Sequence, residues 1–173
     1  MSIAAPALDA VHAKSLSEMH DVLVAANINP RTGLSTDYLN HFNEMVMLLD
    51  LLAMDSEVAE EILTWRPVDY RHHFEHSGFR AKSLALLGYE LCPATTKRQL
   101  EVMVAEIDTV LIEAQRFVGE APESEETFIV VQQSKDAVED LIARASALIN
   151  GHAIEEPVAV DDAQVAVDAL FEG

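Results

Sequence analysis

Two long stretches of helical periodicity, separated by only a few residues, limit what the second half of this 173-residue chain can form. Apolar residues recur in both stretches at steps of three, four or seven positions, which is the spacing of one face of a helix. Over residues 95–118 they are Leu100, Met103, Ile107, Val110, Ala114 and Phe117, and over residues 125–149 they are Val131, Val138, Leu141, Ala145 and Leu148. The connection, Gly119 to Ser124, is so short that the two helices must pack antiparallel.

Helical spacing also marks the first half of the chain. Residues 7–26 carry Leu8, Val11, Leu16, Met19, Leu23 and Ala26, and residues 35–54 carry Tyr38, Phe42, Met45, Leu49 and Leu52. Shorter helices are expected over residues 57–91, where Pro67 and Gly78 interrupt the pattern. The sequence therefore predicts an all-α fold, an antiparallel bundle of the helices near 7–26, 35–54, 95–118 and 125–149, with 57–91 inserted as a cap of short helices.

The chain is expected to divide into three parts. Residues 1–150 would form the helical bundle domain, because Asn150-Gly151 is a typical helix end. Residues 151–160 contain Gly, Pro and charged residues and are predicted to be a linker. Residues 161–173 would then form a C-terminal helical docking peptide.

Charge and composition exclude several classes of partner. The net charge is −19, and residues 99–173 contain 17 acids and three bases, so nucleic acid and anionic membrane surfaces are not expected partners. No apolar run reaches the roughly 18 residues of a membrane span, and no signal peptide is evident. Cys92 is the only cysteine and no Gly-rich phosphate loop occurs, so we expect a cytoplasmic protein with no disulfide and no cofactor.

The densest polar cluster lies in two segments, around residues 36–44 and 70–76. Its candidate site residues are Asp37, Asn40, His41, Glu44, His72 and His76. Asp37, His41 and Glu44 share one helical face, and His72 and His76 stand one turn apart. Hydrogen bonding that joins the cap to the bundle is one interpretation, with no metal bound. The other is a metal site, for which His41, Glu44, His72 and His76 are the candidate ligands.

The first of these segments also carries a resemblance. The stretch TDYLNHFNEMVMLL, residues 36–49, together with SGFR at residues 77–80, is similar to a family of bacterial helical proteins. The resemblance implies that these residues belong together, as a site or as one packing unit, and it implies no mechanism.

A catalytic amide is a further hypothesis. Gln132 and Gln133 lie in the middle of the predicted last long helix. The chemotaxis phosphatase family uses a Gln on a long helical hairpin to orient water, within an Asp-x-x-x-Gln motif. Here Phe128 and Ile129 occupy the acid's position. No catalytic residue is therefore predicted, and whether the chain is an enzyme is left open.

The C-terminal residues carry the resemblance that bears on function. Residues 164–171 read QVAVDALF, which is similar to the peptide by which the flagellar-motor switch protein binds the phosphorylated chemotaxis response regulator, Gln-x-x-Ile/Val-Asp-Ala-Leu-Leu. The C-terminal peptide of the chemotaxis phosphatase is similar too. The residues that would contact the partner are Gln164, Val167, Asp168, Leu170 and Phe171.

The spacing within this peptide agrees with docking. Val167, Leu170 and Phe171 form one stripe if the segment is helical, and so short a helix would fold on binding in a partner's groove. We therefore expect a signalling protein that binds a response-regulator receiver domain and that could aid its dephosphorylation. Three alternatives stay open: a tail packed on its own bundle, a metal- or small-ligand-binding bundle, and a scaffold that forms a homodimer through its heptad seam.

Overall fold

A computed structural model describes residues 5–152 of the chain, with side chains from Lys14 onward. Its α-helices are α1 (Ala5–Ala25), α2 (Asn40–Leu52), α3 (Ala59–Thr64), α4 (Tyr70–His76), α5 (Lys82–Leu91), α6 (Ala94–Glu120) and α7 (Glu125–Ile149). Two 3₁₀ turns, η1 (Thr36–Leu39) and η2 (Ser56–Val58), precede α2 and α3. Residues 5–152 contain no strand, which confirms the all-α prediction. None of the helices in this range is both long enough and apolar enough to cross a membrane.

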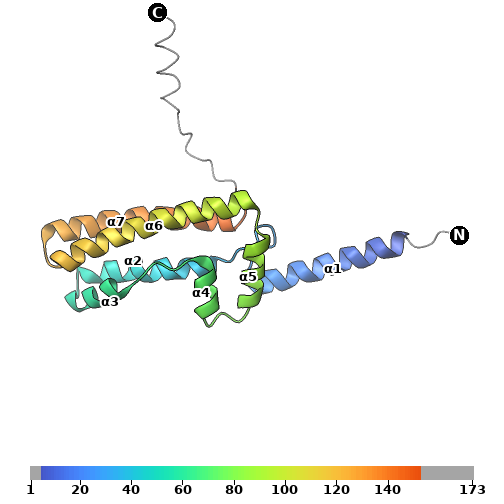
Figure 1. Ribbon diagram of the computed structural model, residues 1–173, viewed down its shortest axis with the longest axis horizontal. Helices are drawn as coiled ribbons and strands as arrows, with labels where there is room; N and C mark the ends of the chain where they lie inside the picture. Colours follow the sequence, from blue (N-terminus) through green and yellow to red (C-terminus); the bar gives the residue numbers. More distant parts are fainter. Residues whose placement is uncertain (1–4, 153–173) are drawn as a thin grey trace, which may run out of the picture.

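The helices are arranged in two layers with an addition at one end. The antiparallel pair α6 and α7 forms one layer, and α2 with α3 forms the other (Figure 1). Within the stack, α2 packs on α7 and α3 packs on α6. The short helices α4 and α5 stand across one end of these layers (Figure 1). The hairpin predicted from the short loop between residues 118 and 125 is therefore the larger half of the bundle.

The predicted seams are buried in α2 and α7. All five residues of the seam predicted over 35–54 lie in the core, Tyr38 in η1 and the other four in α2. The α7 seam extends to polar positions and runs, in steps of four and three, through Thr127, Val131, Ser134, Val138, Leu141, Ala145 and Leu148. In α6, Leu111 and Val118 are buried where Val110 and Phe117 were expected. A straight helix repeats every 3.6 residues, so its buried face drifts from a strict heptad. These seams pack against one another within one chain.

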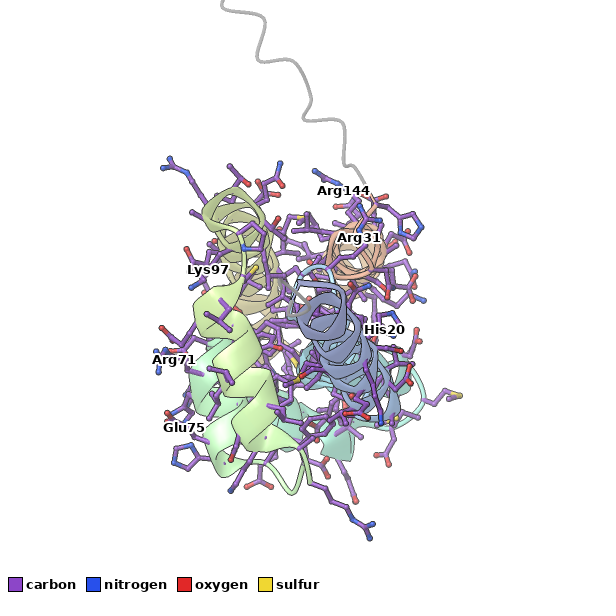
Figure 2. The ribbon with its side chains drawn as sticks, turned by 90° about the vertical axis from the view of Figure 1, so that its right-hand side faces the viewer. His20, Arg31, Arg71, Glu75, Lys97 and Arg144 are labelled. Carbon is purple, nitrogen blue, oxygen red and sulfur yellow. The ribbon has the colours of Figure 1, made fainter. Side chains whose placement is uncertain are left out.

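The prediction for residues 7–26 was wrong in its packing. The helix forms, but α1 projects away from the bundle (Figure 1) and is seen end-on in Figure 2. Leu16 is 72% exposed and Met19 56% exposed, and among the stripe residues from Lys14 onward, where side chains are described, only Leu23 and Ala26 pack against the core. Periodicity cannot tell which neighbour a helix has, and α3, which was expected in the cap, occupies the place beside α6.

The loop between α1 and η1 contacts both α7 and α5 at one end of the bundle. The hydroxyl of Thr32 donates to the carbonyl oxygen of Ile149 over 2.7 Å. Gly33, at φ +73°, lies against Gly88 of α5 so closely that a Cβ on either residue would overlap the backbone of the other. Only glycine allows this approach of a loop to a helix.

Substitution of Gly88 tests this contact. In Gly88→Ala the new methyl group would collide with the carbonyl oxygen of Gly33. Overpacking costs about 1–3 kcal/mol and the better helix propensity of Ala returns about 1 kcal/mol. Because the obstacle is backbone and not a flexible side chain, we expect a net loss of about 1–2 kcal/mol and a fall in Tm of roughly 2–8 °C, measured by thermal unfolding followed by circular dichroism. The control is Gly78→Ala, whose Cβ would meet nothing within 4 Å. Equal Tm values for the two variants would contradict the tight approach.

Candidate functional site

A shallow hollow of about 380 Å³ lies between α2 and α4. We call it the histidine hollow; its lining residues are Asn40, His41, Glu44, Val68, His72, His73, His76 and Ser77. Five of the six residues of the predicted polar cluster therefore line one surface, although they come from segments about 30 residues apart. The sixth, Asp37, is not in this lining. Its carboxylate accepts hydrogen bonds from the Asn27 amide (2.6 Å) and the Ser35 hydroxyl (3.0 Å) at the start of η1.

One wall of the hollow is α4, and buried aromatic residues hold this helix in place. Asp69 caps it, accepting a hydrogen bond from the backbone N–H of His72 over 2.8 Å. The Tyr38 hydroxyl donates to the carbonyl oxygen of Val68 over 2.8 Å, just before the cap. Tyr70 and Phe74 of α4 are buried in the core. With that face of α4 packed inward, His72 and His76 are left on its exposed face.

His41 is the histidine most firmly fixed in the hollow. Its ring stacks on Trp65 with centroids 4.8 Å apart and planes 19° from parallel. Its Nε2 lies 3.0 Å from the carbonyl oxygen of Arg66, and because a carbonyl can only accept, Nε2 carries the proton. Burial lowers the pKa of His41, although the hydrogen bond to Arg66 opposes this. His41 is thus a neutral ring at pH 7 with Nδ1 as its unprotonated nitrogen.

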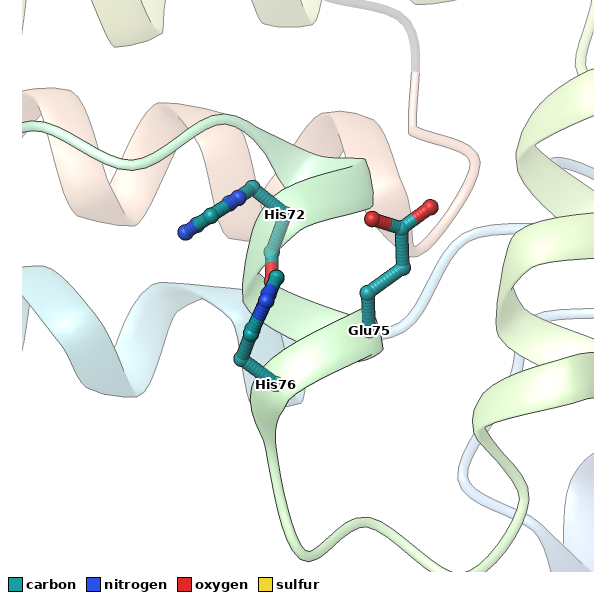
Figure 3. A group of neighbouring side chains, drawn as sticks. All are labelled: His72, Glu75 and His76. Atoms are coloured by element: carbon teal, nitrogen blue, oxygen red, sulfur yellow. The ribbon is translucent and has the colours of Figure 1, made fainter.

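The remaining histidines differ in exposure. His73 is half-buried against the edge of Tyr38, with ring centroids 5.5 Å apart, and burial lowers its pKa. His72 and His76 are exposed, with ring centroids 4.0 Å apart. The Nδ1 of His76 lies 2.9 Å from the carbonyl oxygen of His72. Potential ligand atoms of His72, Glu75 and His76 lie within 4.8 Å of one another (Figure 3). These three residues could hold a metal ion.

Two features of this region were missed by the sequence reasoning. His73 is adjacent to the predicted candidates, but its helical position alone does not place it in the hollow. Asp108 of α6 lies near Tyr38 and raises the pKa of that phenol together with burial, which is the larger cause. Burial also raises the pKa of Asp108 itself to about 6. Within residues 5–152, its Oδ1 is a buried oxygen with no hydrogen-bond partner.

The other candidate residues lie elsewhere. Gln132 and Gln133 are exposed on α7, and the Gln132 amide donates to the carboxylate of Asp136 over 3.0 Å. They do not line the histidine hollow. Gln164, Val167, Asp168, Leu170 and Phe171 lie outside the described residues.

Comparisons with protein-family models, with curated proteins and with solved structures give no match. Function must therefore be inferred from the residues and their arrangement.

Asp108→Asn tests the buried carboxylate. The folded pKa of about 6 lies above the ordinary 3.8. Between these values the folded protein holds a proton that the unfolded chain has lost, so this group lowers stability as the pH rises from about 4 to 6. We expect Asp108→Asn to be more stable than the wild type at pH 7 by about 1 kcal/mol, after discounting for the exposed part of the side chain.

The measurement is urea unfolding of both proteins at pH 4, 5, 6 and 7. The advantage of the variant should disappear near pH 4. Glu106→Gln, at an exposed acid of the same helix, is the control and should change stability by less than about 0.5 kcal/mol. A pH-independent difference between wild type and Asp108→Asn would show that the carboxylate is not desolvated.

Proposed function

We propose that this chain is an interaction protein of bacterial chemotaxis or two-component signalling, and that residues 161–173 dock a response-regulator receiver domain. The observation that carries the proposal is the pattern of residues 164–171, with Gln164, Val167, Asp168, Ala169 and Leu170 at the positions of the switch-protein peptide. In this proposal, the helical bundle is the body from which the peptide is presented.

The end of α7 supports a division between body and peptide. Ile149 is buried and its carbonyl oxygen is bound by Thr32, so the bundle core reaches to this residue. The chain then leaves the helix through Asn150 and through Gly151 at φ +77°, a left-handed conformation that commonly ends helices. The side chains that form the core between α2, α6 and α7 thus come from residues that precede the linker.

The charge of the body supports selection among partners. Residues 99–173 contain 17 acids and three bases, and many of these carboxylates lie on the exposed faces of α6 and α7. A strongly acidic surface beside a docking peptide would speed encounter with a basic face and repel acidic competitors. In the proposal, apolar anchors supply affinity and the charged body supplies orientation.

Docking could have either of two consequences for the partner, retention or loss of its phosphoryl group. Hydrolysis of an acyl phosphate needs little beyond a positioned water molecule. The exposed amides of Gln132 and Gln133 on α7 are the candidates to position one. A dephosphorylation assay with Gln132→Ala and Gln133→Ala, run beside the binding assay, separates the two consequences.

Deletion of Val158–Gly173 tests whether the bundle depends on the peptide. The core described above ends at Ile149, so we expect helical content and Tm to be nearly unchanged. Thermal unfolding followed by circular dichroism is the measurement. A fall in Tm of more than about 5 °C, equivalent to roughly 1 kcal/mol or more, would mean that the tail packs on its own bundle.

Leu170→Ala combined with Phe171→Ala tests the docking peptide itself. Burying each side chain is worth roughly 1.5–3 kcal/mol, so we expect the double variant to bind a receiver domain at least about a hundredfold more weakly. Calorimetry with receiver domains activated by an acyl-phosphate mimic provides the affinity.

Two further variants serve as controls for this binding measurement. Asp168→Asn should cost less and reduce the dependence on salt, because its charge would act mainly in orientation. His76→Ala, at an exposed position of α4, should bind as the wild type does. Wild-type affinity in the double variant would remove the main support for the signalling proposal.

A further inference from the structure

We propose that α4 carries a binding site for a divalent transition-metal ion, with His72, Glu75 and His76 as its protein ligands. This proposal is independent of the docking peptide, because all three residues lie within one short helix of the body.

The spacing of the three residues brings their ligand atoms together. Positions i, i+3 and i+4 share one side of a helix, and the ligand atoms of His72, Glu75 and His76 all lie within 4.8 Å of one another. Figure 3 shows both imidazoles projecting from the same side of α4, with Glu75 on the adjoining side. Ligands about 2.1 Å from an ion lie roughly 3–4 Å apart. Small rotations of exposed side chains would therefore suffice to complete a site.

The helix also sets the protonation of one ligand. The Nδ1 of His76 lies 2.9 Å from the carbonyl oxygen of His72, and it must carry a proton to donate to that acceptor. In the neutral ring, Nε2 is then the atom with a free lone pair. A hydrogen bond from the other ring nitrogen to a backbone carbonyl is the usual way in which a metal-binding histidine is oriented.

The carboxylate of Glu75 is available for a cation. Among the described side chains it takes part in no ion pair, whereas Arg71 of α4 is paired with Glu90 of the neighbouring helix α5. Its charge would offset part of the ion's charge, and the net charge of −19 raises the local concentration of cations around the whole chain.

The surroundings of α4 favour a defined site over a loose pair of histidines. Tyr70 and Phe74 are buried and Asp69 caps the helix, so the backbone that carries the ligands is held in place. Both histidines also line the histidine hollow, into which an open coordination position could face. Two imidazoles and a carboxylate suit Zn²⁺, Ni²⁺ or Cu²⁺ better than Mg²⁺ or Ca²⁺, which prefer oxygen ligands.

The test uses the full chain without an affinity tag, titrated with Zn²⁺ and with Ni²⁺ in a competition assay against a chromogenic chelator. We expect one saturable site per chain. His72→Ala and His76→Ala should each weaken binding at least tenfold, and Glu75→Gln should weaken it by a smaller factor. Circular dichroism checks that every variant keeps its helices, since the three side chains are exposed.

Three matched substitutions and one deletion locate the site. His20→Ala and His152→Ala remove exposed histidines elsewhere and should leave affinity unchanged, as should deletion of residues 158–173. Glu44→Gln changes the α2 wall of the hollow and should cost less than Glu75→Gln. The proposal is overturned if binding survives in the His72→Ala/His76→Ala double variant, if His20→Ala or His152→Ala abolishes it, or if Glu44→Gln has the larger effect.

Discussion

The antiparallel packing of α6 on α7 is the interaction on which the rest of the molecule depends. Its turn is closed by two hydroxyl groups: Ser124 caps α7 by accepting from the backbone N–H of Thr127 over 3.0 Å, and the buried Thr127 hydroxyl lies 2.7 Å from the Ala121 carbonyl oxygen. Buried polar groups are tolerated only with such partners. The two long helices then expose one apolar surface to the second layer, where α2 covers α7 and α3 covers α6.

The position of the histidine hollow follows from this hairpin through a single side chain. The Gln115 amide of α6 donates to the carbonyl oxygens of Ile62 (2.6 Å) and Trp65 (2.9 Å) at the C-terminal end of α3, where carbonyl oxygens lack the usual helical partner four residues on. Trp65 is thereby held beside His41 of α2, with the two rings stacked. The chain then turns at Pro67 and begins α4 on the far side of the hollow.

Burial divides four neighbouring histidines into two kinds. His41 and His73 are partly buried against aromatic rings, and burial lowers the pKa of each, so they are neutral parts of the packing. His72 and His76, one helical turn apart on α4, line the same hollow but are exposed. Residue type alone does not distinguish the partly buried histidines from the exposed ones. The burial of Tyr70 fixes the orientation of α4, and that orientation determines which imidazoles are exposed to solvent.

Local periodicity determined the helices, the α6–α7 hairpin and the pairing of His72 with His76, because these depend on residues within a few turns and on one short connection. The docking peptide predicted from the pattern of residues 164–171 lies outside residues 5–152 and stays a prediction. Tertiary structure determined which helices pack together and which side chains are buried, and periodicity specifies neither. It placed α3, and not α1, beside α6, and it joined the α2 and α4 halves of the polar cluster. It also desolvated Asp108, which no local pattern marks. The physical reason is that burial depends on partners distant in sequence, and equivalent apolar stripes compete for the same neighbours.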